Sequence, residues 1–160
     1  MSAADVLALL RERGRTLAVA ESLTGGLLTD AFVQVPGASA VLLGGIVSYA
    51  TELKHEVLGV DRALLEAEGP VHPEVARQMA DGVRRALAIR GRIADVGLST
   101  TGVAGPDPQG GRAPGTVYVG VAIGSRLLAV PGGFAGDRAS IRAAAVRLAL
   151  DTLAAQLRAE

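Results

Sequence analysis

One stretch near the amino terminus limits the folds open to this chain more than any other. Residues 17–20 (LAVA) form a short apolar run typical of a buried strand, and residues 27–35 have the apolar spacing of a helix. Between them lies a polar turn with two glycines, residues 20–26 (AESLTGG). Open α/β sheets bind ligands at such a junction, where a strand ends and a helix begins. Ser22 lies in this turn, beside helix-start amides that can bind an anion or an oxyanion.

Apolar periodicity and glycine or proline boundaries divide the rest of the chain into further elements. Thr51 and Asp137 are the expected caps of two helices. Strands and helices alternate early and a β-hairpin follows late, which predicts a three-layer α/β/α sandwich with a mixed, mostly parallel sheet. We expect one domain over residues 1–160. The expected helices are residues 6–13, 51–58, 61–68, 73–87 and 137–153, and the expected strands are residues 45–49, 93–102, 116–123 and 126–130.

Composition excludes several classes of function. The formal net charge is +0, which argues against a general nucleic-acid binder. The chain has no cysteine, so it has no disulfide, thiol nucleophile or thiolate metal site. We find no signal-peptide pattern at the amino terminus and no uncharged apolar run long enough to cross a membrane. We therefore expect a cytoplasmic protein whose partners include neither nucleic acid nor membrane.

Common uses of a serine or of a glycine-rich turn fit this sequence poorly. Ala20 and Thr24 stand where the hydrolase pattern G-x-S-x-G has glycines. His55 and His72 are the two histidines, and a triad of either one with Ser22 stays open at this point. Two isolated histidines do not predict a metal site. The turn also lacks the length and the lysine of a phosphate-binding loop.

A serine–lysine pair is another recognised way to activate a serine, and it fits Ser22 better. The chain has 16 lysine and arginine residues together, and Lys54 is the one lysine. As a base, Lys54 would need its pKa lowered from about 10.4 to about 7–8, a change of about 4 kcal/mol that burial can supply in part. Tyr49 lies near Lys54 in the sequence and could orient it. The alternative interpretations are that Ser22 caps a helix and that Tyr49 is a surface aromatic.

Five short motifs occur in order along the chain and together resemble one family, the carboxy-terminal domain of the competence-damage-inducible protein CinA. The resemblance extends from about residue 6 to residue 157. One departure is Leu23, where many relatives have cysteine, and we expect this leucine to pack away from the substrate. The motifs are AESLTGG at 20–26, SYATELK at 48–54, TGVAGP at 101–106, PGTV at 114–117 and GDR at 136–138.

The resemblance implies an amidase that hydrolyses the carboxamide of nicotinamide mononucleotide to nicotinic acid mononucleotide and ammonia, in pyridine nucleotide recycling. The implied mechanism is acyl transfer, with Ser22 as nucleophile, Lys54 as general base and Tyr49 assisting the pair. The oxyanion donors would be helix-start amides after Ser22 or groups near residues 101–102. Arg138 is the preferred phosphate ligand. The predicted substrate-binding residues are Thr24, Gly25, Gly26, Thr101, Gly102 and Arg138.

The resemblance further implies a homodimer that acts on a small-molecule nucleotide without a metal or an organic cofactor. Two alternatives stay open from the sequence. The first is a nucleotide-binding or interaction module that has the fold but no turnover. The second keeps the serine–lysine chemistry but acts on another small amide.

Overall fold

A five-stranded mixed sheet forms the centre of the structure, a computed structural model that describes residues 1–159. Its strand order is β2-β1-β3-β4-β5. The strands β2, β1 and β3 are parallel, and β4 and β5 continue the sheet in antiparallel pairing. The strands are β1 (Leu17–Glu21), β2 (Leu42–Val47), β3 (Val96–Gly102), β4 (Thr116–Ile123) and β5 (Arg126–Gly133).

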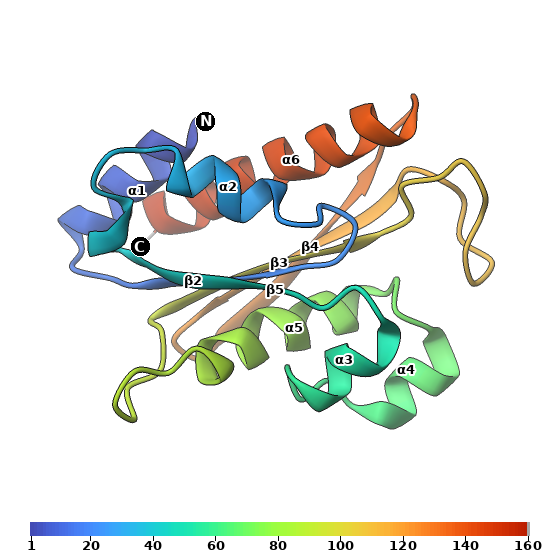
Figure 1. Cartoon of the computed structure of the whole chain (residues 1–160), viewed down its shortest axis with the longest axis horizontal. Helices are drawn as coiled ribbons and strands as arrows, with labels where there is room; N and C mark the ends of the chain where they lie inside the picture. Colours follow the sequence, from blue (N-terminus) through green and yellow to red (C-terminus); the bar gives the residue numbers. More distant parts are fainter. Residues whose placement is uncertain (160) are drawn as a thin grey trace.

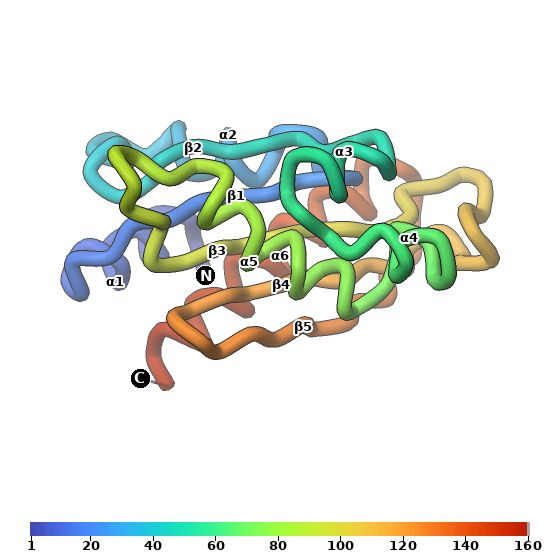
Figure 2. Tube along the Cα trace, turned by 90° about the horizontal axis from the view of Figure 1, so that it is seen from below, coloured from blue at the N-terminus to red at the C-terminus, as the bar shows by residue number. Residues whose placement is uncertain are grey.

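Helices cover both faces of the sheet. Figure 1 shows α1, α2 and α6 on one face and α3, α4 and α5 on the other, and Figure 2 shows the same arrangement from below. This confirms the predicted three-layer α/β/α sandwich with a mixed sheet. No helix in the described part of the chain is long and apolar enough to cross a membrane. The helices are α1 (Ala3–Glu12), α2 (Leu27–Val33), α3 (Thr51–Glu56), α4 (Arg62–Glu68), α5 (Pro73–Ala86) and α6 (Arg138–Arg158), with a 3-10 turn at Ala38–Ala40.

Strand β1 contributes side chains to the hydrophobic core on each face of the sheet, because successive residues of a strand point to opposite faces. Leu17 and Val19 pack with α1, α2 and α6, whereas Ala18 and Ala20 pack with α5 and the segment after α3. All of these side chains are fully buried. The same alternation directs residue 21 towards α2 and residue 22 towards α3.

Some element boundaries differ from the prediction. Strand β2 begins at Leu42 and ends at Val47, so Tyr49 lies beyond the strand. Helix α3 begins at Thr51, and the cap position is Ala50, which makes no side-chain hydrogen bond. The prediction of Thr51 as a cap is therefore wrong. Asp137, in contrast, accepts a hydrogen bond from the Ser140 amide and caps α6 as expected.

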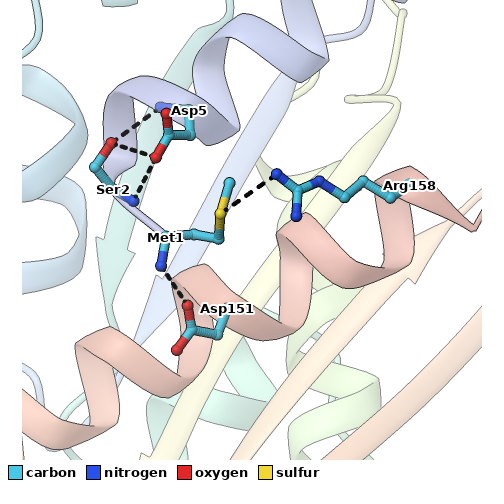
Figure 3. Close-up of polar contacts among 5 residues, drawn as sticks. All are labelled: Met1, Ser2, Asp5, Asp151 and Arg158. Atoms are coloured by element: carbon cyan, nitrogen blue, oxygen red, sulfur yellow. Dashed lines mark hydrogen bonds and ion pairs between the residues drawn. The ribbon is translucent and has the colours of Figure 1, made fainter.

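The amino terminus packs against the last helix (Figure 3). Ser2 and Asp5 form a capping box at the start of α1, in which each side chain accepts a hydrogen bond from the other's backbone amide. The Met1 amine lies 2.6 Å from the Asp151 carboxylate, and Arg158 contacts the Met1 sulfur. These contacts join α1 to α6 on one face of the sheet.

Helix α5 lies against the segment that follows α3, and Gly82 makes this close approach possible. A Cβ atom at Gly82 would lie 1.8 Å from the Leu58 carbonyl oxygen. Leu58 comes two residues after the end of α3, the helix that carries Lys54. Gly82 therefore allows α5 to pack closely against the segment that follows the lysine-bearing helix.

We predict that Gly82→Ala destabilises the protein. Replacing a glycine inside a helix with alanine usually stabilises it by about 0.5–1 kcal/mol. Here the added methyl group has no room, and we expect a loss of about 1–3 kcal/mol. Urea unfolding measures the change. The control is Gly133→Ala, because a Cβ atom there meets nothing within 4 Å, and stabilisation by Gly82→Ala would contradict the close approach.

Candidate active site

The polar turns predicted from the sequence meet at the carboxyl ends of the three parallel strands. Ser22 follows β1, and its amide donates to the Thr100 carbonyl of β3 at 3.0 Å. Ser48 follows β2, and its amide donates to the Glu21 carbonyl of β1 at 2.9 Å. These two hydrogen bonds fix the positions of the three strand ends relative to one another. Thr101 is the last but one residue of β3, and the parallel register of β1 and β3 places it opposite Ser22.

Lys54 and Ser22 form a buried pair below this junction. The Lys54 Nζ atom lies 3.2 Å from Ser22 Oγ and 2.7 Å from the Ser48 carbonyl oxygen. Lys54 is 1% exposed and Ser22 is 8% exposed. Because a carbonyl only accepts, the amine donates to Ser48, which leaves the lone pair of a neutral amine free to accept the Ser22 proton.

Burial changes the acid–base properties of this lysine. Loss of hydration lowers the pKa of Lys54 from 10.5 to about 8, and the nearby Glu52 carboxylate has a smaller effect in the opposite direction. About a tenth of the Lys54 amines are then neutral at pH 7. An amine with this pKa is suited to act as a general base near neutral pH.

Two charged residues that the sequence analysis did not single out hold the Ser22 turn in place. The buried Glu21 carboxylate accepts hydrogen bonds from the Leu28 and Thr29 amides at the start of α2 and from the Thr29 hydroxyl. Arg142 of α6 donates to the carbonyls of residues 23 and 24. The sequence offered one signal for each of these residues. Glu21 is an acidic residue at the end of an apolar strand, and Arg142 lies one helical turn after Arg138.

Glu21 also restricts the source of an oxyanion hole. The Leu28 and Thr29 amides already donate hydrogen bonds to the Glu21 carboxylate, so these helix-start donors are not available to a substrate. Ser22 itself does not cap the helix, since the cap position is Gly26 without a side-chain bond. Within residues 1–159, the amides of Leu23 and Thr24 make no hydrogen bond. They are the free donors closest in sequence to Ser22.

A cleft with a volume of about 130 Å³ opens above the Ser22–Lys54 pair. Arg138 crosses its mouth, donating to the Gly105 carbonyl at 2.6 Å and to the Tyr49 hydroxyl at 3.1 Å. Tyr49 is 62% exposed and lies at the entrance. The predicted site residues that line this cleft are Ser22, Tyr49, Lys54, Thr101, Gly102 and Arg138.

Three predicted substrate-binding residues do not line the cleft. The Thr24 side chain is fully buried, and its hydroxyl shares a hydrogen bond of 2.8 Å with Thr100. Gly25 and Gly26 have φ angles of +56° and +102°, which favour glycine, and so they shape the turn. Leu23 packs with Ile141 and Ala145 as expected, but it also lines the cleft, so the prediction that it faces away from the site is wrong.

Both histidines are engaged away from Ser22. His55 Nδ1 lies 2.7 Å from the Val60 carbonyl oxygen, and His72 accepts a hydrogen bond from the Glu74 amide at the start of α5. Neither residue lines the cleft in the described structure. The serine–histidine triad left open by the sequence is therefore not formed.

The family model for the CinA C-terminal domain matches residues 1–157. The chain belongs to this family. A CinA-like protein of Frankia casuarinae is 52% identical over 146 residues, which are 91% of this chain and 33% of that protein. A putative competence-damage inducible protein of Geobacillus kaustophilus is 52% identical over 117 residues, 73% of this chain and 27% of that protein.

Solved structures of the CinA superfamily have the same architecture. A CinA superfamily protein from Klebsiella pneumoniae superposes with a TM-score of 0.92 at 28% identity, covering 99% of this chain and 96% of that chain. A competence/damage inducible protein from Agrobacterium tumefaciens gives a TM-score of 0.83 at 31% identity, covering 96% of each chain. The CinA domain thus matches whole chains among solved structures but about a third or less of the two curated relatives above.

We predict that Lys54→Met stabilises the fold at pH 7. Burial lowers the pKa of Lys54 from its ordinary value of 10.5 to about 8, so folding at pH 7 must bury a charged amine. The unfolded chain binds this proton more tightly, and the wild type therefore gains stability as pH rises from 8 to 10.5. Removing this amine should raise the free energy of unfolding by about 1–2 kcal/mol, after the loss of its hydrogen bonds. Urea unfolding at pH 7 and pH 10 measures the gain, which should shrink at pH 10. A variant that is less stable at both pH values would contradict this account.

Proposed function

We propose that this CinA domain hydrolyses the carboxamide of nicotinamide mononucleotide, giving nicotinic acid mononucleotide and ammonia. The observation that carries the proposal is the buried contact of 3.2 Å between Ser22 Oγ and Lys54 Nζ. A lysine with a pKa near 8, held against a serine hydroxyl at the base of a cleft, is suited to acyl transfer. We further propose that the protein acts in the cytoplasm, and the homodimer implied by the family stays a prediction.

The reaction begins with neutral Lys54. Its amine takes the Ser22 proton as Oγ attacks the carboxamide carbon, and the carbonyl oxygen becomes an oxyanion. The Leu23 and Thr24 amides are the proposed donors to this oxyanion. The tetrahedral intermediate then collapses, the carbon–nitrogen bond breaks, and protonated Lys54 returns a proton to the leaving nitrogen, which departs as ammonia. Water, activated by Lys54, hydrolyses the ester on Ser22 and releases the carboxylic acid.

The size and charge of the cleft suit the reacting end of a nucleotide. A volume of about 130 Å³ is below the usual range for whole small-molecule sites, so the cleft accommodates the ring and carboxamide while the ribose phosphate extends to the mouth. Arg138 lies there and supplies a guanidinium for the phosphate. Tyr49 already accepts a hydrogen bond from Arg138, and this contact orients both side chains.

The first test is ammonia release from nicotinamide mononucleotide. We expect release by the wild type and a loss of at least about 10³-fold in Ser22→Ala, because the nucleophile is removed. Ser22→Ala should stay folded, since its hydroxyl does not cap α2. Ser125→Ala is the control, because Ser125 lies in the turn between β4 and β5, away from the cleft. No release by a folded wild-type protein would overturn the proposal and favour a nucleotide-binding module.

The pH dependence tests the role of Lys54. The neutral amine is the active form, so kcat/KM should rise about tenfold per pH unit below pH 8 and level off above it. Lys54→Arg should lose most turnover while still binding the nucleotide, because arginine stays protonated. A flat profile from pH 6 to pH 10, or an active Lys54→Arg variant, would exclude Lys54 as the base.

A further inference from the structure

We propose that Thr101 distinguishes a carboxamide from a carboxylate by accepting a hydrogen bond from the substrate's NH2 group. The inference deepens the proposed amidase function and rests on it. It assigns a specificity to a side chain that the family resemblance only places near the substrate.

The hydrogen bond between Thr101 and Pro70 fixes what the threonine can offer a ligand. Thr101 Oγ1 lies 2.7 Å from the Pro70 carbonyl oxygen. A carbonyl oxygen can only accept, so the hydroxyl donates its single proton to Pro70. The Thr101 side chain is almost fully buried and lines the cleft. The Thr101 oxygen therefore presents only lone pairs to a ligand in the cleft. It can accept a hydrogen bond from the ligand but has no proton left to donate.

The sheet places this acceptor beside the nucleophile. The Ser22 amide donates to the Thr100 carbonyl, so residue 101 follows directly after the contact between β1 and β3. Ser99 of the same strand donates to the Ala76 carbonyl of α5, on the α5 face of the sheet. Because side chains alternate along a strand, Thr101 points to that same face. Ser22 and Lys54 line the cleft together with Thr101.

An acceptor at this position matches the substrate and opposes the product. The carboxamide nitrogen carries two protons, one of which can bond to Thr101, and this contact directs the carbonyl oxygen towards other donors such as the Leu23 amide. The carboxylate product has no proton at neutral pH, so one of its oxygens faces the lone pairs of Thr101 without a hydrogen bond. Unpaired polar contacts of this kind weaken binding. Thr101 thereby favours the amide and promotes release of the acid.

The test compares the two ligands in a protein that cannot turn over. Calorimetry on Ser22→Ala gives the dissociation constants of nicotinamide mononucleotide and of nicotinic acid mononucleotide, and hence the preference for the amide. We expect Thr101→Val, added to Ser22→Ala, to reduce that preference about tenfold, because valine keeps the shape and removes the acceptor. The amide should bind more weakly and the acid should bind as well as before or better.

Three further variants in the same background separate specificity from structure. Thr100→Val removes the neighbouring hydroxyl, which bonds to Thr24 away from the cleft, and should leave the amide-to-acid preference unchanged. Thr101→Ser keeps the acceptor and should also keep the preference. If Thr101→Val does not fold, Thr101→Cys replaces it, because a thiol is similar in size but is a weak acceptor. The same loss of preference is then expected.

The measured preferences and the ammonia assay together distinguish failure of the Thr101 proposal from failure of the amidase function. A preference that Thr101→Val or Thr101→Cys leaves intact overturns it, as does an equal loss in Thr100→Val. If the wild type releases ammonia and the preference does not change, this inference alone fails and the amidase function stands. If the folded wild type releases no ammonia from nicotinamide mononucleotide, the amidase function fails and this inference fails with it.

Discussion

The site depends on one physical constraint, which is the burial of a single amine. Lys54 lies with its Nζ atom between the Ser48 carbonyl and the Ser22 hydroxyl, and loss of hydration lowers its pKa to about 8. An exposed lysine would stay charged at neutral pH and could not accept a proton. Burial therefore links the fold to the proposed chemistry. It also reduces the stability of the protein, fully below pH 8 and less and less up to pH 10.5.

The surrounding structure supports this burial from several elements. Small side chains on β1 and a glycine on α5 let the helices approach the sheet closely, which seats α3 and its lysine. The Glu21 carboxylate and the Arg142 guanidinium hold the turn that carries Ser22 from the opposite side. Contacts from four helices and three strand ends thus converge on one serine and one lysine. Such convergence produces a preorganised pair, which suits a nucleophile and its base.

Much of the fold followed from local patterns in the sequence. The apolar run of β1, the proline at the start of α5 and the aspartate cap of α6 each depend on neighbouring residues, and each is where the pattern indicated. The start of β2 and the cap of α3 were predicted less well. Strand β2 is extended to Leu42 by pairing with β1, and a pairing partner distant in sequence leaves no local signal.

The sequence by itself determined the alternation of strands and helices, the junctions that hold Ser22, Tyr49 and Thr101, and the family to which these motifs belong. Only the tertiary structure decided which side chains face the cleft. In the folded chain, the Thr24 hydroxyl points inward to Thr100 and the Leu28 amide of α2 donates to Glu21. Lys54, rather than its neighbour His55, points towards Ser22. The physical reason is that hydrogen bonds between distant strands and helices fix side-chain direction and burial, and no local pattern encodes these partners.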